Sequence, residues 1–336
     1  MSTELLLKKR ISLLQGLVIT GLITCGIYLG LKVHFEEKIS AEHPADTHET
    51  TGVRTNRNHS YRFTQPLIGF DIPNESANLQ DVKLQLRKVI NENCSNGNLY
   101  QASVYLRDLE NGEWTSLNED ITYHPGSLIK VPMLIYYLKE SETHPEILNK
   151  TLRIDQPLSG LPAQTYTKES IEFNKSYTVK ELLKYMASYS DNRATYLLNT
   201  NCDEERFKKV FSDLNLQIPD IHDTNYTISV SDYSVFMRVL FNATYLNPVN
   251  SDFALSLLTE SNFDSGITRQ LPSDVTVARK FGEMKIANKR ELHECGIIYC
   301  NKRPYMVTIM TKGYNASQLA QVIGSISDTI FHFFCA

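Results

Sequence analysis

Residues 123–130 read YHPGSLIK, and this stretch, with the apolar run 131–138 behind it, decides the fold. Its proline and glycine are typical of a loop, and the apolar run predicts a helix that begins near Ser127. Lys130 follows three residues later, so its side chain lies on the same helical face as the Ser127 hydroxyl. Unpaired N–H groups at a helix start favour a developing negative charge. The stretch therefore suits a serine nucleophile beside a lysine, although a serine that only caps the helix explains the same residues.

Two more short motifs follow along the chain. Ser190-Asp191-Asn192 lies between predicted helices at 180–189 and 193–199, where a cap-and-turn role also explains its residue types. Lys280-Phe281-Gly282 ends a predicted strand that begins at Val275. There the glycine would let a ligand approach the backbone closely, and the lysine would face the cleft as a cation. A lysine at a strand end is more often only solvated, so each motif alone is weak.

In this order, the three motifs resemble those of the serine β-lactamase and penicillin-binding superfamily, and those of the class A β-lactamases most closely. The resemblance extends over roughly residues 67–336. It implies an α/β (α+β) fold, in which an antiparallel sheet is flanked by helices and joined to an all-α subdomain. Predicted strands stand at both ends of this range with helices between them, which agrees with that fold. The sheet subdomain is expected at 67–122 and 275–336, and the helical subdomain at 123–274.

The resemblance implies an acyl-transfer role for four residues. Ser127 would be the acylated nucleophile, and Lys130 would take its proton or shape its pKa. Ser190 would pass a proton to the leaving nitrogen, and Asn192 would orient the substrate. All four residue types match the family pattern, so formation of an acyl-enzyme is expected.

The third motif both supports the resemblance and departs from it. Lys280 would draw in the substrate carboxylate beside Gly282, and the backbone N–H groups of Ser127 and Glu283 would form the oxyanion hole. Phe281, however, stands where the family has Thr or Ser. This change removes a hydroxyl donor to a bound carboxylate and adds bulk beside it.

A second departure concerns the hydrolysis of the acyl-enzyme. Class A enzymes carry a loop glutamate that activates the deacylating water, and the corresponding stretch here, 218–226, contains no Glu. Asp220, His222 and Asp223 are the local substitutes, and Asp220 or Asp223 is the candidate base, although exposed loop acids are usually only solvated. Loss of a general base typically costs about 10²–10⁴-fold in rate.

The N-terminus predicts a membrane anchor. Residues 11–31 carry no charge and follow a basic cluster at 8–10. About 20 apolar residues cross a bilayer, and the basic flank favours an N-terminus inside. We expect a cytoplasmic segment at 1–10, a retained signal anchor at 11–33 and a polar linker at 34–66, so that the catalytic domain is extracytoplasmic and the protein is a single-pass membrane protein.

Composition and cysteine spacing exclude several classes of function. The net charge is −4 and no Lys/Arg stripe recurs on one element, so nucleic-acid binding is not expected. No cysteine or histidine group has metal spacing, and no metal or cofactor is expected. An odd number of cysteines follows the anchor, and buried free thiols are the default expectation; they are Cys94, Cys202, Cys295, Cys300 and Cys335.

The sequence thus predicts a membrane-anchored, monomeric serine hydrolase of the class A β-lactamase type, which hydrolyses or binds a β-lactam or a peptidoglycan-like peptide through Ser127. One alternative keeps the fold and changes the substrate: a D-Ala-D-Ala peptidase or an esterase works without the loop glutamate. Another is a non-catalytic binding or sensor domain tethered at the membrane.

Overall fold

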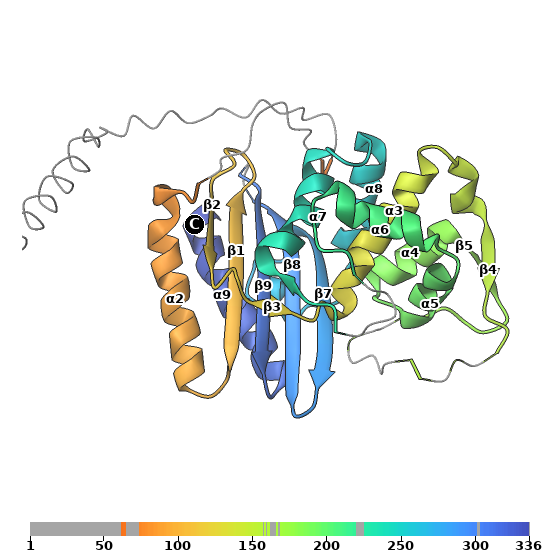
Figure 1. The fold of residues 1–336 in the computed structure, drawn as a ribbon. Coiled ribbons are helices and arrows are strands. Elements are labelled where there is room, and N and C mark those ends of the chain that lie inside the picture. The colour runs from red at the N-terminus through yellow and green to blue at the C-terminus, as the bar shows by residue number, and fades with distance from the viewer. Residues whose placement is uncertain are drawn as a thin grey trace, which may run out of the picture. The chain divides into compact units, whose positions relative to one another are not determined.

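The computed structural model describes residues 62–64, 74–156, 158, 160–161, 166, 169–219, 225–300 and 303–335. All of them belong to one compact unit, 53–336, and only this unit is described below (Figure 1). The cytoplasmic segment and anchor predicted at 1–33, and nearly all of the linker predicted at 34–66, lie outside the described residues. Within the described part of the chain, no helix is both long enough and apolar enough to cross a membrane.

A five-stranded sheet with the order β2-β1-β9-β8-β7 forms the centre of the unit. Its neighbouring strands pair antiparallel throughout. The strands are β1 (Gln101–Asp108), β2 (Trp114–Leu117), β7 (Thr276–Ile286), β8 (Lys289–Tyr299) and β9 (Tyr305–Gly313). Two strands precede the helical block in sequence and three follow it, as the α/β (α+β) interpretation predicted.

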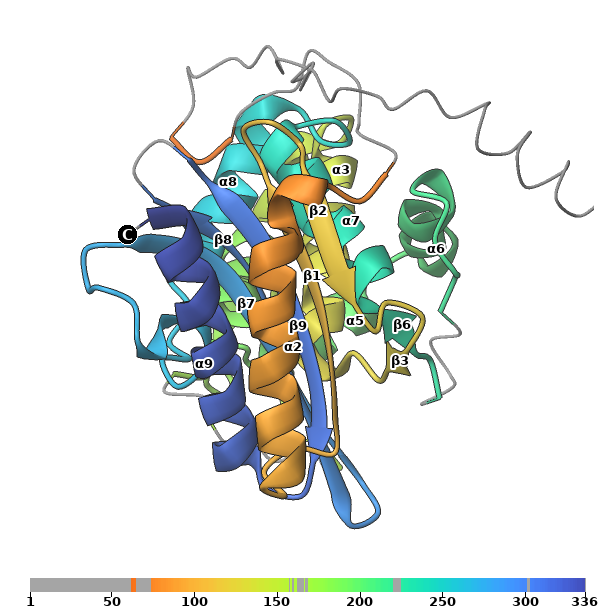
Figure 2. The same ribbon diagram turned by 90° about the vertical axis from the view of Figure 1, so that its left-hand side faces the viewer.

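Two helices cover one face of the sheet, and the remaining helices lie on the other side (Figures 1 and 2). The covering pair is α2 (Gln80–Ser95) and α9 (Ala316–Cys335), which pack side by side (Figure 2). The helical block consists of α3 (Lys130–Ser141), α4 (Val179–Ser188), α5 (Asn192–Thr200), α6 (Glu204–Asp213), α7 (Val230–Asn242) and α8 (Pro248–Thr259). Short strand pairs and 3₁₀ turns connect these elements: β3 (Thr122–Tyr123) with β6 (Ile228–Ser229), β4 (Thr151–Arg153) with β5 (Ser176–Thr178), and η1 (Ala77–Leu79), η2 (Gly126–Ile129), η3 (Pro145–Asn149) and η4 (Ile267–Arg269).

The sheet separates two hydrophobic cores because successive side chains of a strand point to opposite faces. In β8, Cys295 and Ile297 join the core shared with the helical block. Leu292 and Ile298 join the core under α2 and α9. Because both faces of the sheet are covered, most residues of its central strands are buried, and in β8 these include the polar residues Glu291, His293 and Glu294.

The start of the helix after the YHPGSLIK stretch differs from the prediction. Residues Gly126–Ile129 form the 3₁₀ turn η2, and α3 begins only at Lys130. The N-cap positions of η2 and α3 are Pro125 and Ile129, and neither makes a side-chain cap. Ser127 is therefore not a capping residue, and the alternative explanation of its place in the sequence is removed.

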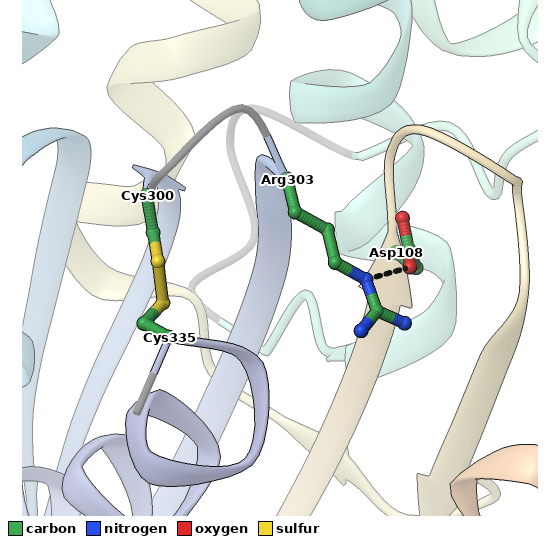
Figure 3. Close-up of a disulfide and its surroundings, with 4 residues drawn as sticks. All are labelled: Asp108, Cys300, Arg303 and Cys335. Carbon is green, nitrogen blue, oxygen red and sulfur yellow. Dashed lines mark hydrogen bonds and ion pairs between the residues drawn. A yellow bond between two sulfur atoms is a disulfide. The ribbon is translucent and has the colours of Figure 1, made fainter.

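The expectation that all five cysteines are free thiols was wrong for two of them. Cys300, just after β8, forms a disulfide with Cys335 at the end of α9 (Figure 3). Their Cα atoms are 6.1 Å apart, inside the range that a disulfide requires. The pairing could not be seen in the sequence at a separation of 35 residues, since only the packing of α9 back onto the sheet brings the two cysteines together. Cys94, Cys202 and Cys295 are free.

Residues 62–64 lie in the range predicted as a linker, yet they pack onto the folded unit. Phe63 is 7% exposed, and Thr64 is buried. The backbone N–H groups of both donate to Asp252 in α8, over 2.7 and 3.2 Å. Tyr299 donates to the Phe63 carbonyl over 2.9 Å. The chain is therefore fastened to α8 and β8 before α2 begins.

Candidate active site

The turn that carries Ser127 lies directly against strand β7. A Cβ atom on Gly126 would lie 2.5 Å from the carbonyl oxygen of Glu283, and Gly126 adopts a left-handed φ of +51°. A Cβ atom on Gly282 would lie 2.3 Å from the carbonyl oxygen of Pro125. Such distances leave no room for a side chain, so the two glycines allow the backbones to meet. The backbone of Ser127 is thereby brought next to that of Glu283, which is the arrangement that a shared oxyanion hole needs.

Lys130, the first residue of α3, reaches across to the turn between α4 and α5. Its Nζ donates to the Asn192 side-chain oxygen over 2.8 Å and to Ser190 Oγ over 3.2 Å. A third bond goes to the Ser190 carbonyl. The ammonium form uses its three hydrogens in these bonds, whereas the neutral amine keeps a lone pair that can accept a proton.

The local sequence explains why Ser190 is presented there. A capping box between Thr178 and Glu181 starts α4, which ends at Ser188. Ser190 then adopts a left-handed φ of +58°, which turns the chain sharply. Asp191 caps α5 by accepting from the Arg193 N–H over 2.8 Å. The cap-and-turn explanation is thus right for Asp191, while the Ser190 hydroxyl points to the lysines.

Lys280 contacts the same hydroxyl from strand β7. Its Nζ donates to Ser190 Oγ over 2.9 Å and to the Phe281 carbonyl over 3.0 Å. The amine also lies 4.3 Å from the centre of the Phe281 ring. Lys280 is 1% exposed and does not line the cavity described below, whereas the sequence predicted a cation facing the cleft. Ser190 Oγ therefore stands between two lysine amines.

Burial changes the chemistry of both lysines. Desolvation lowers the pKa of Lys130 to about 7, although the Asp191 carboxylate opposes the change. Desolvation also lowers the pKa of Lys280 well below its ordinary value; repulsion from Lys130 adds to this, and Glu294 opposes it. A buried lysine that is neutral near pH 7 is able to act as a general base.

Phe281 is packed into an aromatic cluster. Its ring stacks on Phe263 with centroids 4.5 Å apart and meets Tyr166 edge-on at 5.7 Å. The side chain is 5% exposed. The ring thus belongs to the core under α9, and the position offers no hydroxyl to a ligand.

A cavity of about 650 Å³ opens in front of Ser127. Its described lining consists of Gly126, Ser127, Ile129, Lys130, Leu161, Tyr166, Ser190, Asn192, Thr195, Tyr196, Asn199, Phe281, Glu283, Met284, Lys285 and Arg290. Within that described lining, the one carboxylate belongs to Glu283, and it is paired with Arg290 over 2.8 Å. The substitute bases Asp220 and Asp223 lie outside the described residues. In the described parts of the chain, no cluster of His, Cys, Asp and Glu could hold a metal ion.

Several residues of the site were not found from the sequence. Tyr166, Tyr196 and Met284 give the cavity apolar walls, and Arg290 neutralises Glu283. Arg290 faces Lys285 across the β7–β8 hairpin, so a hairpin prediction at 276–299 would have placed it at the cleft. No short motif marks the aromatic residues, because they reach the cavity from separate segments.

Comparisons with known proteins agree with the fold. A family model described as the beta-lactamase enzyme family matches residues 82–334. A structure of PBP-A is 20% identical, covers 78% of this chain and 98% of its own, and has a TM-score of 0.65. A beta-lactamase from Chitinophaga pinensis DSM 2588 is 19% identical, covers 74% of this chain and 99% of its own, and has a TM-score of 0.64. A variant of PBP-A, solved as an acyl-enzyme complex with penicillin G, is 20% identical to this chain and has a TM-score of 0.64. The match covers 76% of this chain and 96% of the PBP-A variant. The search of curated proteins gives no significant match.

Proposed function

The chain belongs to the beta-lactamase enzyme family, and on this premise we propose that it is a serine hydrolase that forms an acyl-enzyme at Ser127. The observation that carries the proposal is the position of Ser190 Oγ, 3.2 Å from the amine of Lys130 and 2.9 Å from that of Lys280. A hydroxyl held between two amines of lowered pKa is placed to relay protons. A solvated cap serine would need neither amine.

The reaction begins at the Ser127 hydroxyl. Neutral Lys130 takes the proton as Oγ attacks the substrate carbonyl, and a tetrahedral oxyanion forms. The N–H groups of Ser127 and Glu283, brought together by the glycine contacts, stabilise that oxyanion. The Ser190 hydroxyl then gives its proton to the leaving nitrogen or oxygen and recovers one from Lys130, so proton and charge balance at the end of acylation.

The fate of the acyl-enzyme separates two substrate classes. The first is a β-lactam that acylates Ser127 and is released slowly, because the one carboxylate in the described lining is already paired with Arg290. The PBP-A variant that resembles this chain was solved as an acyl-enzyme with penicillin G, which supports the same chemistry here. The second is an ester or a D-Ala-D-Ala-type peptide. The apolar residues of the cavity and the loss of a hydroxyl at Phe281 favour an ester without a carboxylate within this class.

Labelling of the purified full-length chain tests the proposal. A labelled penicillin and a fluorophosphonate should each add one mass equivalent, and peptide mapping should place it on Ser127. Ser127→Ala, as the control, should stay unlabelled. If neither reagent modifies Ser127 in a folded sample, the proposal fails. Steady turnover of a chromogenic cephalosporin would favour a β-lactamase, whereas one stoichiometric burst with turnover of an ester would favour the second substrate class.

We further propose that the catalytic unit is a monomer tethered outside the cytoplasmic membrane by residues 11–33. The uncharged segment and the basic cluster at 8–10 support this topology. The protein should stay with membranes after alkaline carbonate washing, and a protease added outside should reach the catalytic unit. Release of the full-length chain by the wash would contradict the anchor. A cellular phenotype that Ser127→Ala leaves unchanged would favour the non-catalytic sensor instead.

A further inference from the structure

A buried polar pair on strand β8 holds the backbone just before the nucleophile. The N–H of His124 donates to Glu291 Oε2 over 2.9 Å. The carbonyl of the same residue accepts from His293 Nε2 over 3.1 Å. Glu291 and His293 are two residues apart on one strand, so their side chains share a face. Both side chains are fully buried, and together they hold the donor and the acceptor of one residue three positions before Ser127.

The hydrogen bonds of His293 define its protonation. The backbone N–H of Thr311 donates to His293 Nδ1 over 3.2 Å, so Nδ1 is the unprotonated nitrogen. The hydrogen of a neutral imidazole is then on Nε2 and is donated to the His124 carbonyl. Both ring nitrogens are thus occupied by backbone groups. The orientation of the imidazole is fixed by β9 on one side. On the other side it is fixed by the segment 124–130, which contains η2 and Ser127 and is called the nucleophile turn below.

The carboxylate of Glu291 is kept charged. Lys312 on β9 pairs with Glu291 Oε1 over 2.7 Å. Burial alone would raise the pKa of Glu291, but the ammonium of Lys312 and the hydrogen bond from the His124 N–H favour the charged form and hold the pKa below its ordinary value. A charged acceptor makes a stronger hydrogen bond to a backbone N–H than a neutral one. The His124 N–H is therefore held firmly.

These two bonds add a second side to the support of the nucleophile turn. On its other side the turn rests on β7, where the Gly126 and Gly282 contacts leave no space to move closer. Those contacts set how near the turn lies to β7, but they do not stop it from lifting away or sliding along the strand. The bonds to His124 tie the turn to the neighbouring strand β8, and the Tyr233 hydroxyl of α7, which donates to the Leu128 carbonyl over 3.0 Å, holds its other end. Pro125 links His124 to η2, and because its ring fixes φ, restraining the His124 backbone also restrains the position of Ser127.

We propose that Glu291 and His293 are positioning residues that clamp the His124 backbone and thereby fix Ser127 and the oxyanion-hole N–H groups. The inference rests on the proposed acyl-enzyme function, since it concerns the same site. Neither residue lines the described cavity, so both act through the turn and not on the substrate. Glu291→Gln weakens one side of the clamp at nearly constant volume, and His293→Phe removes the other side with a planar ring that is somewhat larger than imidazole. His293→Gln keeps a donor.

The rate of Ser127 acylation should separate positioning from a purely structural role. A displacement of about 1 Å in a reacting group costs on the order of 10²-fold in rate. Glu291→Gln should therefore lower the acylation rate at saturating penicillin by about 10-fold and His293→Phe by about 10²-fold, with the half-saturating concentration little changed. His293→Gln should recover part of the loss. Asp108→Asn is the matched control, because Asp108 is also a fully buried sheet carboxylate that pairs with a cation and accepts from backbone N–H groups. Its acylation rate should equal that of the wild type.

A second measurement decides the clamp without any activity. Backbone hydrogen exchange of peptides covering 124–130 should be at least 10-fold faster in Glu291→Gln and His293→Phe than in Asp108→Asn, under conditions where all are folded. Acylation within twofold of wild type, equal loss in Asp108→Asn, or unchanged exchange at 124–130 would each overturn the clamp. If His293→Phe does not fold, His293→Gln and Glu291→Gln carry the test. A wild type that takes no label would refute the proposed function, while the exchange data would still decide the clamp.

Discussion

At the scale of single residues, we expect the ionisation of Lys130 to set the pH range of the proposed acylation of Ser127. Only the neutral amine accepts the Ser127 proton, and burial lowers the pKa of this amine to about 7. Below that pH the protonated fraction rises, so the acylation rate should fall about tenfold per pH unit and should level off above pH 8. The measurement is the second-order labelling rate of the full-length chain by a penicillin from pH 5 to 9.

Lys130→Met is the control for that profile. It removes the amine but keeps an unbranched side chain, and it should lower the rate by about 10²–10⁴-fold and abolish the rise near pH 7. A wild-type profile that stays flat from pH 5 to 9, or a variant that keeps the same inflection, would show that another group supplies the base.

Phe281 sets how well the site can hold a substrate carboxylate. Phe281→Thr places a hydroxyl on the strand beside Lys280, and one hydrogen bond of about 1 kcal/mol should raise the labelling rate by a carboxylate-bearing penicillin roughly fivefold. The same change removes a ring stacked on Phe263, so the free energy of unfolding should drop by about 3 kcal/mol. Urea unfolding and labelling rates measure the two effects. Phe281→Leu should lose stability without gaining rate, and an equal gain in both variants would mean that only bulk matters.

At the scale of elements, the contact between η2 and β7 is the feature on which the oxyanion hole depends. In Gly282→Ala the new Cβ atom would lie 2.3 Å from the Pro125 carbonyl and 3.0 Å from the Leu128 nitrogen. These are backbone atoms, so the turn itself must move. We expect the acylation rate to fall on the order of 10²-fold.

A glycine on the neighbouring strand provides the matched control for this substitution. In Gly296→Ala the nearest atom would be Ile267 Cδ1 at 3.2 Å, the end of a side chain that can adjust. Its acylation rate should stay within about twofold of the wild type. Comparable losses in the two variants, measured by the same labelling assay, would mean that strand packing and not the turn controls the site.

At the scale of the whole molecule, the structure shows which features a sequence reveals and which it hides. The gathering of Lys130, Ser190, Asn192 and Lys280 could be predicted, because these residues stand in short motifs that resemble those of a known family. The Cys300–Cys335 disulfide could not, since no local pattern records that α9 returns to the end of β8.

The support of the nucleophile turn was hidden for the same physical reason. His124 and Glu291 are 167 residues apart in sequence and meet only because η2 packs on the sheet. The packing of Phe281 was also missed, because its neighbours Phe263 and Tyr166 come from loops with no periodic pattern. Short motifs therefore point to the candidate reactive groups, whereas tertiary packing decides how firmly those groups are held.

The segment before α2 contributes to the stability of the whole unit. Phe63 packs edge-on against Tyr299 at 5.7 Å, and Asp252 accepts from two consecutive N–H groups. Phe63→Ala in the full-length chain should therefore lower the free energy of unfolding by about 3 kcal/mol. Arg62→Ala is the control and should cost much less, because Arg62 is exposed. Equal unfolding midpoints for Phe63→Ala and the wild type in urea would show that this segment only lies on the surface.

The disulfide affects the stability of the whole molecule because it closes a long loop that contains strand β9 and helix α9. With a sequence separation of 35 residues, loop-closure entropy predicts a contribution of about 4 kcal/mol to the free energy of unfolding. The double variant Cys300→Ser/Cys335→Ser should unfold at a correspondingly lower urea concentration, and reduction of the wild type should give the same shift. Cys94→Ser, which removes an exposed free thiol, should leave the midpoint unchanged.

The same double variant tests whether the disulfide, which stabilises the face of the sheet under α9, affects the rate of labelling at Ser127. Neither cysteine lines the cavity, and α9 covers the face of the sheet opposite to the helical block that carries Lys130 and Ser190 (Figure 2). Below the unfolding transition, the labelling rate of the variant should therefore match that of the wild type. A rate loss in the folded variant would mean that α9 positions β7 and β8, and with them the residues that hold the nucleophile turn.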